Sequence, residues 1–256
     1  MGKLIAVYGN NGSGKSTIAS NLAFALSKQF LTGIIGLNTN YGSIQHFFGM
    51  RIENDKNLRN IILSNGLDDI AKNFTQHPTQ TNLFVLSMPN EDDCLKLADT
   101  SIGLDSSTAI NIVVTLKEKF DYLIVDCTND VNDPLSIYSL VYSNKVINSI
   151  KPTLQGLSFL NSYKSLLEAL KVYQDRIINV SNSDKNTIGL ARFEKIANIK
   201  FDVALPFDKK VEISESEGIP ISQSMKKSKS WFKEDYLSNL KILLSLVQGG
   251  NIVGKV

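Results

Sequence analysis

A glycine-rich segment near the start of the chain has the residue types that bind phosphate groups. It fits the pattern G-x-x-x-x-G-K-[ST] without a mismatch. Small residues let successive backbone N–H groups curl around a phosphate at a helix N-terminus, where the helix dipole is positive. In this pattern Lys15 reaches the β- and γ-phosphates, and the Ser16 hydroxyl binds Mg²⁺. The candidate nucleotide-binding residues are Gly9, Asn10, Asn11, Gly12, Ser13, Gly14, Lys15, Ser16 and Thr17.

The flanking residues supply the strand and the helix that this motif requires. Residues 4–8 form a short apolar run that predicts a buried strand, and residues 17–26 carry apolar side chains at helical spacing. A strand, a glycine-rich turn and a helix therefore follow one another in the required order. This context predicts a site for a nucleoside triphosphate rather than an ordinary glycine-rich turn.

A second candidate ligand for Mg²⁺ is Asp126. Residues 120–126 read Phe-Asp-Tyr-Leu-Ile-Val-Asp, which is an apolar strand that ends in a carboxylate. At the carboxyl end of a strand beside the phosphate loop, such a carboxylate binds Mg²⁺ directly or through water. Ser16 and Asp126 are thus the expected metal-binding pair.

The rest of the chain alternates between predicted strands and helices. Strands are predicted at 31–37, 83–86, 145–150, 176–180 and 201–205, helices within 43–74 and at 106–120, 134–142, 152–173, 186–198 and 230–248, and a helix start at 89–93. Alternation predicts an α/β fold, with a mostly parallel twisted sheet, helices on both faces and the ligand at the carboxyl ends of the strands, as in P-loop NTPases. We expect one domain spanning residues 1–256, because no linker, repeat or low-complexity segment interrupts the chain.

The composition is that of a soluble globular protein, with 43% hydrophobic and 20% charged residues. No apolar run approaches the ~20 residues of a membrane-spanning helix, and the N-terminus does not resemble a signal peptide. The two cysteines, Cys94 and Cys127, lack metal-ligand spacing, so we expect reduced thiols and a cytoplasmic location. The net charge of +2 does not by itself indicate a nucleic-acid partner.

The C-terminal region leaves an interaction with DNA or lipid open. A basic cluster lies beside two aromatic residues and has two possible interpretations. It could contact DNA or anionic lipid, or it could be the solvated start of a helix. The solvated helix start is favoured because four lysines do not form a sustained basic stripe. The apolar face of residues 230–248 fits core packing better than membrane insertion. Residues 248–256 are too few and too weakly apolar to form a stable membrane anchor. The cluster consists of Lys226, Lys227, Lys229 and Lys233, with Trp231 and Phe232.

An ordered series of segments resembles the deviant-Walker partition and positioning ATPases of the ParA/MinD family. Besides the phosphate loop, the series includes residues 37–43, the strand that ends at Asp126, and residues 151–153. The segments Leu-Pro-Phe-Asp-Lys-Lys-Val at 205–211 and Glu-Gly-Ile-Pro-Ile at 217–221 are similar to a late segment of the family. The resemblance implies that Asn179, Pro206 and Phe207 frame an adenine, that the cofactors are ATP or ADP with Mg²⁺, and that the protein forms a homodimer and binds a further protein partner.

Three positions depart from the pattern of the family. The signature lysine, which in the family reaches the nucleotide of the opposite subunit, is replaced by Asn10, and the two switch aspartates are replaced by Asn38 and Asn40. An amide cannot act as a carboxylate base and is a poorer neighbour for Mg²⁺. The resemblance therefore implies a catalytic set of Lys15 with Asn40 and Asn10 in degenerate form. We expect weak or absent hydrolysis, and whether the protein is an ATPase stays open.

The degenerate site is similar to that of the CpaE/TadZ branch, which positions pilus-assembly machinery. The leading interpretation is a nucleotide-gated dimer that acts in the spatial positioning or assembly of a cellular machine of the pilus, secretion or conjugation type. The alternative is an active partition ATPase that binds DNA non-specifically. A metal-insertion ATPase is disfavoured by the lack of a C-x-C pair. An ABC-type ATPase is disfavoured because no LSGGQ-like segment occurs and Cys127, rather than a glutamate, follows Asp126.

Overall fold

An eight-stranded sheet organises the part of the chain that the computed structural model describes, residues 2–64, 70–90, 104–182, 188–225 and 235–250. The strand order is β3-β4-β2-β5-β1-β6-β7-β8. Neighbouring strands are parallel, except that β3 runs antiparallel to β4. The strands are β1 (Lys3–Gly9), β2 (Thr32–Gly36), β3 (Thr75–Gln76), β4 (Leu83–Leu86), β5 (Tyr122–Asp126), β6 (Lys145–Ile150), β7 (Ile177–Asn182) and β8 (Val203–Leu205).

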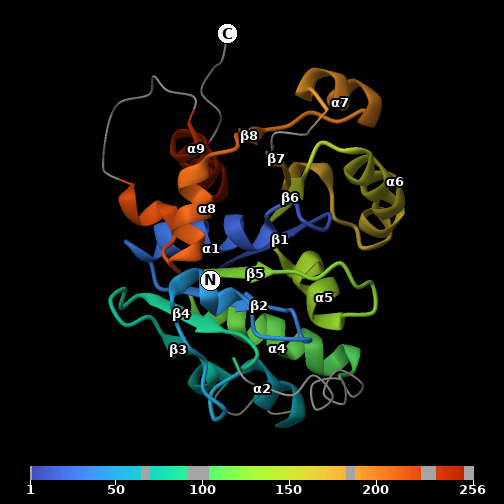
Figure 1. Cartoon of the computed structure of the whole chain (residues 1–256). Helices are drawn as coiled ribbons and strands as arrows, with labels where there is room; N and C mark the ends of the chain where they lie inside the picture. The colour runs from blue at the N-terminus through green and yellow to red at the C-terminus, as the bar shows by residue number, and fades with distance from the viewer. Residues whose placement is uncertain (1, 65–69, 91–103, 183–187, 226–234, 251–256) are drawn as a thin grey trace.

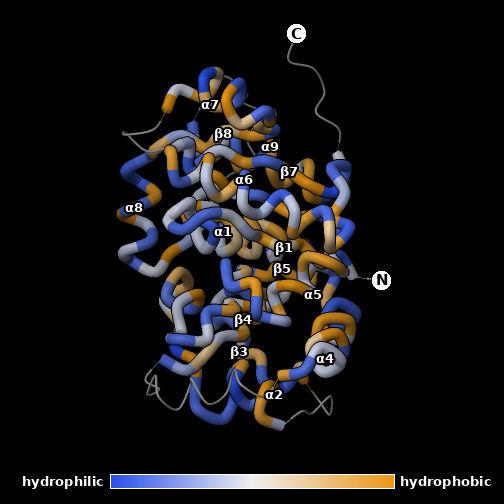
Figure 2. The backbone as a smooth tube through the Cα atoms, turned by 90° about the vertical axis from the view of Figure 1, so that its right-hand side faces the viewer, coloured by the Kyte–Doolittle hydropathy of each residue, from blue (hydrophilic) through white to orange (hydrophobic). Residues whose placement is uncertain are grey.

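Helices cover both faces of this sheet (Figure 1). One apolar core lies between the sheet and the layer formed by α1, α8 and α9, and a second lies between the sheet and α2, α4, α5 and α6. Figure 2 shows α8 and α4 on opposite sides of the strands. The helices are α1 (Lys15–Ser27), α2 (Leu58–Ser64), α4 (Ser106–Lys119), α5 (Pro134–Tyr142), α6 (Leu154–Ala169), α7 (Leu190–Ala197), α8 (Lys209–Ser216) and α9 (Tyr236–Gln248), with 3₁₀ turns at η1 (Ile44–Phe48), η2 (Ile70–Asn73), η3 (Gln174–Arg176) and η4 (Ile221–Ser224).

Short polar side chains fix where five of the helices begin. Each accepts a hydrogen bond from a backbone N–H in the first turn, where the helix leaves its N–H groups without a partner. The capping residues are Asp105 for α4, Asp133 for α5, Thr153 for α6, Asp208 for α8 and Asp235 for α9. These caps set the ends of the helices that surround the carboxyl edge of the sheet.

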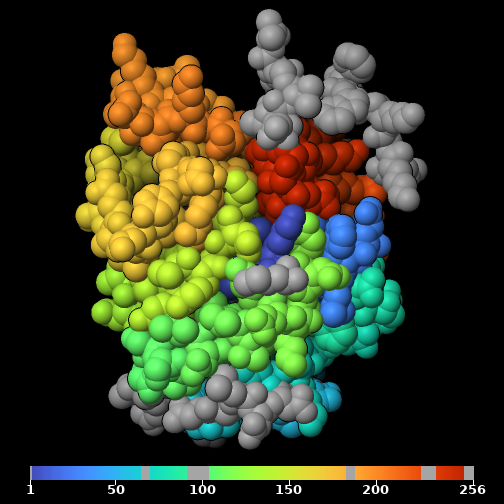
Figure 3. Space-filling model, turned by 180° about the vertical axis from the view of Figure 1, so that it is seen from behind, coloured from blue at the N-terminus to red at the C-terminus, as the bar shows by residue number. Residues whose placement is uncertain are grey.

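The first strand and the last helix meet at the amino edge of the sheet. The Lys3 ammonium donates a hydrogen bond to the backbone carbonyl of Gln248 at 3.0 Å, and the Lys3 N–H donates to the carbonyl of Asp121 at 2.9 Å. Figure 3 shows residues at the blue, N-terminal end of the chain between the red C-terminal helix and green segments of the middle of the chain. This contact lies at the edge opposite to the carboxyl ends of the strands, where a ligand site is expected.

The structure confirms the predicted α/β fold and corrects several of its elements. The described residues between 43 and 74 contain two 3₁₀ turns and one short helix, α2. The predicted helix at 152–173 is shorter, spanning Leu154–Ala169. Helix α8 was not predicted. Several predicted features lie wholly or largely outside the described residues. They are the helix start at 89–93, the first residues of the helices predicted at 186–198 and 230–248, and the basic cluster at 226–233.

The predicted apolar face of the last helix packs into the core. Tyr236, Leu240, Leu243 and Val247 of α9 are buried against the sheet. Within the described ranges, the structure contains no helix with both the length and the apolar character needed to cross a bilayer.

Candidate nucleotide-binding site

The backbone of the phosphate loop packs closely against the neighbouring strands. At Gly9 the backbone has φ +154°, and a Cβ atom there would lie 1.8 Å from the carbonyl oxygen of Ser149 on β6. Gly14 has φ +79°, and its Cβ would lie 2.0 Å from the Asn182 amide nitrogen on β7. Since any side chain at either position would collide with these neighbours, both positions require glycine.

Hydrogen bonds hold the loop in a curled form. The Ser149 hydroxyl and the Asn182 amide both donate to the carbonyl of Ser13, at 2.7 and 2.9 Å. The Ser13 N–H donates to the carbonyl of Asn10 at 3.1 Å. The loop is therefore already shaped as a concave turn at the N-terminus of α1, which is the arrangement that binds phosphate.

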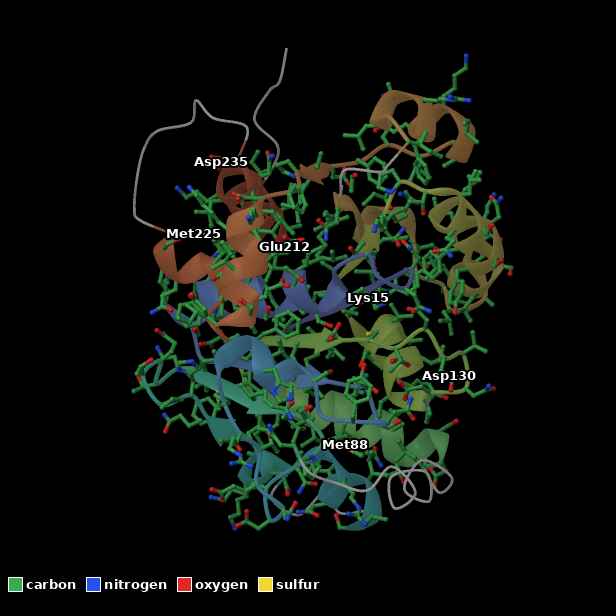
Figure 4. All side chains as sticks on the ribbon, viewed as in Figure 1. Lys15, Met88, Asp130, Glu212, Met225 and Asp235 are labelled. Atoms are coloured by element: carbon green, nitrogen blue, oxygen red, sulfur yellow. The ribbon has the colours of Figure 1, made fainter. Side chains whose placement is uncertain are left out.

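Lys15 is folded back onto the loop. Its ammonium donates to the carbonyls of Gly9 and Asn10, at 3.1 and 3.5 Å. Burial lowers the pKa of Lys15, and the nearby Asp126 and Cys127 partly oppose that shift. Figure 4 shows Lys15 near the middle of the molecule, where β1 turns into α1. Phosphate oxygens would be stronger acceptors for this buried ammonium than the two neutral carbonyls.

Ser16 and Asp126, the two candidate metal ligands, lie in direct contact. The Ser16 hydroxyl donates to Asp126 Oδ2 at 2.6 Å. Asp126 is 8% exposed, and burial raises its pKa to about 6 although the Ser16 hydrogen bond and the Lys15 charge both lower it.

The other oxygen of that carboxylate, Asp126 Oδ1, is buried and lacks a hydrogen-bond partner among the described residues. A carboxylate oxygen and a hydroxyl are hard oxygen ligands of the kind that Mg²⁺ takes. Because a buried charge is costly without a partner, these two residues fit a divalent cation.

The side chain of Asn10 is engaged within its own subunit. Its Oδ1 accepts a hydrogen bond from the Lys151 N–H at 3.0 Å, and its Nδ2 donates to the carbonyl of Asn11 at 3.2 Å. Asn10 is 4% exposed. The residue at the signature position therefore fastens the phosphate loop to the segment between β6 and α6 instead of projecting away from the subunit.

Asn11 and the two switch asparagines lie at the rim of the site. Asn11 is exposed at the tip of the loop, and its Oδ1 accepts from Asn129 Nδ2 at 3.0 Å. Asn38 and Asn40 follow β2, whose last residue pairs with Asp126. The Asn40 N–H donates to Asn38 Oδ1 at 3.1 Å. The Asn38 side chain and the Asn40 backbone thus form a local turn just after the strand that pairs with Asp126.

Asn179, which the resemblance assigns to the adenine, lies on β7 together with a second asparagine, Asn182. Asn179 lies inside β7, 5% exposed, where its Oδ1 accepts from Asn148 and its N–H donates to Asp202. Asn182, at the carboxyl end of β7, contacts the phosphate loop and pairs in register with Leu205. Of the two asparagines, Asn182 is the one that contacts the phosphate loop, which makes it a further candidate for the adenine side.

Pro206 and Phe207 follow β8 at the same edge of the sheet. They come directly after Leu205, which is the partner of Asn182 in the sheet, and Phe207 is 37% exposed. The predicted phosphate and metal residues and this part of the adenine side, together with Asn182, are thus gathered along one edge. Cys127, next to Asp126, is buried and its pKa is raised well above the usual value, mainly by burial, so it is an inert thiol.

Solved structures with this architecture are nucleotide-binding ATPases. A septum site-determining protein MinD from Pyrococcus horikoshii, complexed with Mg-ADP, has a TM-score of 0.74 and 17% identity and covers 96% of each chain. The fold is that of MinD and ParA. A ParA family ATPase from Chlorobium tepidum has a TM-score of 0.73 and 19% identity, covering 96% of this chain and 99% of its own. MinD in a MinC:MinD complex from Aquifex aeolicus has a TM-score of 0.75 and 15% identity, covering 99% and 98%.

These similarities extend over nearly the whole chain and concern the fold. No protein-family model matches the sequence, and no curated protein matches it either. The arguments for ligand and function therefore rest on the residues at the carboxyl edge of the sheet.

Proposed function

We propose that this chain is an ATP-binding protein of the ParA/MinD type whose nucleotide-dependent dimer acts in the spatial positioning or assembly of a cellular machine, with little or no hydrolysis. The observation that supports it is the pairing of Ser16 with a buried Asp126 beside Lys15, while amides occupy the switch positions after β2. The residues proposed to hold the nucleotide thus lie together, while the two positions that correspond to the switch aspartates of the family carry amides.

Each residue has a distinct part in holding the nucleotide. Lys15 would exchange its two carbonyl acceptors for β- and γ-phosphate oxygens. Ser16 and Asp126 would hold Mg²⁺, which neutralises charge on the β- and γ-phosphates when it is bound. Asn182, Pro206 and Phe207 would border the adenine. A protein partner of this kind is known for the Aquifex aeolicus MinD, which is found in a complex with MinC.

Lys15→Ala is expected to weaken ATP binding at least tenfold, about 1.4 kcal/mol. The substitution removes the partly buried ammonium that would face the phosphates, together with its hydrogen bonds to the carbonyls of Gly9 and Asn10. Isothermal titration calorimetry with ATP and Mg²⁺ measures the change. Lys145→Ala is the matched control, because Lys145 begins β6 at the amino edge and donates to the carbonyl of Asp175. Equal affinity in wild type and Lys15→Ala would remove the phosphate loop from the proposal.

A nucleotide-dependent dimer can be tested at Asn10. Two phosphate loops that face each other across a two-fold axis bury both nucleotides in one interface, so ATP stabilises the dimer that binds it. Asn10→Lys restores a cation at the signature position and should tighten the ATP-bound dimer specifically. It also breaks the hydrogen bond to the Lys151 N–H, which costs about 1 kcal/mol of stability.

Sedimentation of each protein without nucleotide, with ADP and with ATP separates the effect of the added charge on the dimer from the effect of the lost hydrogen bond. Asn10→Ala is the matched control, since it loses the same hydrogen bond and adds no charge. We expect the ATP-bound dimer of Asn10→Lys to be tighter than that of wild type or Asn10→Ala. A wild-type monomer under all three conditions at high concentration would contradict the dimer proposal.

A steady-state ATPase assay with and without DNA distinguishes the proposal from the partition-ATPase alternative. The proposal expects slow turnover that DNA does not stimulate. Fast turnover that rises with DNA of any sequence would favour an active partition ATPase instead.

A further inference from the structure

Two side chains outside the sequence motifs hold the loop after β5 against the phosphate loop. The Tyr163 hydroxyl, on α6, donates a hydrogen bond to the backbone carbonyl of Asn129. The side-chain amide of Asn129 donates in turn to Asn11 Oδ1, at the tip of the phosphate loop, at 3.0 Å. Asn129 is therefore held from two sides, by helix α6 through its carbonyl and by the phosphate loop through its amide.

The ring of Tyr163 is fixed by its neighbours. It stacks on Phe159 of the same helix, with 4.3 Å between the ring centroids, and its centroid lies 6.0 Å from that of Tyr8 on β1. Tyr8 and Phe159 are both buried and belong to the core between the sheet and α6. Because packing fixes the orientation of the ring, the Tyr163 hydroxyl is a preorganised anchor for the carbonyl of Asn129.

The place of Asn129 corresponds to the γ-phosphate end of a nucleotide. Strand β5 is a neighbour of β1 in the sheet, and Asn129 comes three residues after Asp126, the proposed Mg²⁺ ligand. Since the metal bridges oxygens of the β- and γ-phosphates, the γ-phosphate lies between the metal and the phosphate loop. A donor that reaches from the loop after β5 to the tip of the phosphate loop is therefore at the end of the site that ATP fills and ADP does not.

We propose that Asn129 binds the γ-phosphate through its side-chain amide, and that Tyr163 is the positioning residue that holds Asn129 in place for this contact. The pair thereby makes the site prefer a triphosphate over a diphosphate. The inference rests on the proposed function, because it requires ATP in the site. When ATP binds, the amide exchanges the neutral oxygen of Asn11 for a phosphate oxygen, and a hydrogen bond to a charged acceptor is roughly twice as strong.

The test compares the dissociation constants of ATP and ADP, each with Mg²⁺, by calorimetry. We expect the ratio of the ADP constant to the ATP constant to fall about fivefold in Asn129→Ala, which loses the amide. In Tyr163→Phe the ratio should fall at least about threefold. That variant keeps the ring and its stacking and loses only the hydroxyl that fixes the carbonyl of Asn129.

The double variant Asn129→Ala/Tyr163→Phe distinguishes positioning from a general effect of Tyr163 on the fold. Because Tyr163 acts through the Asn129 amide, the double variant should have the same ratio as Asn129→Ala alone. Tyr122→Phe is the matched control, since it also removes a tyrosine hydroxyl with a hydrogen bond, here from Lys3 at the amino edge of the sheet. It should keep the wild-type ratio.

Equal binding of ATP and ADP by wild type would overturn the inference and would leave the nucleotide site itself intact. An unchanged ratio in Asn129→Ala or in Tyr163→Phe would also overturn it. So would a further fall in the double variant, or a comparable fall in the Tyr122→Phe control. If wild type bound neither nucleotide, the proposed function would fail, and this inference with it.

Discussion

Asp126→Asn is expected to stabilise the metal-free protein by up to about 3 kcal/mol at about pH 8. Burial raises the pKa of Asp126 from 3.8 to about 6, and each unit of pKa corresponds to about 1.4 kcal/mol. Above the folded pKa the carboxyl group must be ionised in a buried place, which costs stability. Asparagine keeps an acceptor for the Ser16 hydroxyl and puts a neutral group in place of the unpaired charged oxygen.

The raised pKa of Asp126 fixes the direction in which its contribution to stability changes with pH. Between the unfolded pKa of 3.8 and the folded pKa of about 6, the folded state binds more protons at Asp126 than the unfolded state does. The contribution of Asp126 to stability is therefore favourable at low pH and is lost as pH rises through this window. The gain from Asp126→Asn should be full above about pH 6 and should shrink toward zero near pH 4.

Urea unfolding in the presence of EDTA, at a series of pH values, measures this gain. Asp130→Asn is the matched control, because Asp130 is an exposed carboxylate in the loop after β5, and we expect a change within about 0.5 kcal/mol. Figure 4 shows Asp130 at the rim of the molecule, apart from Lys15. Asp126→Asn should also abolish the tightening of ATP binding by Mg²⁺. A variant that is no more stable than wild type at about pH 8 would show that the buried carboxylate carries no such cost.

The parts of the site that could be predicted from sequence are those that depend on local patterns. The phosphate loop and the strand that ends at Asp126 each combine a short apolar run with a functional residue at a fixed position. Both patterns are complete within a few residues. Strands buried on both faces are recognisable as near-continuous apolar runs. For the same reason the predicted limits of β6 agree with the structure.

Elements that depend on distant partners could not be predicted. Helix α8 buries only Val211 and carries charged residues on its remaining surface, so it has no clear apolar period. Asn10 accepts a hydrogen bond from the Lys151 N–H, which lies 141 residues later in the sequence. Nothing in the local sequence pattern indicates that contact.

Asn179 and Asn182 show how the end of a strand affects which residue becomes a candidate for the site. The sequence predicts that the strand ends at residue 180, which places Asn179 close to its carboxyl end. In the structure β7 continues to Asn182. Because side chains alternate between the two faces of a strand, residues three apart point to opposite sides, and only Asn182 contacts the phosphate loop.

Hydrolysis of ATP by the wild-type protein is expected to be far slower than the ~10 s⁻¹ typical of enzymes. Asn38 and Asn40 occupy the switch positions after β2, and neither amide can accept a proton from water. Changing both to aspartate introduces carboxylates just after β2, the strand that pairs with the strand of Asp126, the proposed Mg²⁺ ligand. Proton transfer to a positioned side chain typically contributes ~10² or more to a rate. The double variant should therefore hydrolyse ATP about a hundredfold faster than wild type.

The structure indicates that this double variant will keep the local fold. The turn after β2 is held by a hydrogen bond from the Asn40 N–H to Asn38 Oδ1, and aspartate offers the same acceptor. Asn82→Asp makes the same chemical change at the start of β4, on the amino edge of the sheet, and should leave the rate unchanged. Single-turnover assays with ATP and Mg²⁺ compare the three proteins. If wild type already turned over at the typical enzyme rate, another group would have to align the water, and Asp130 in the loop after β5 would be the first residue to substitute.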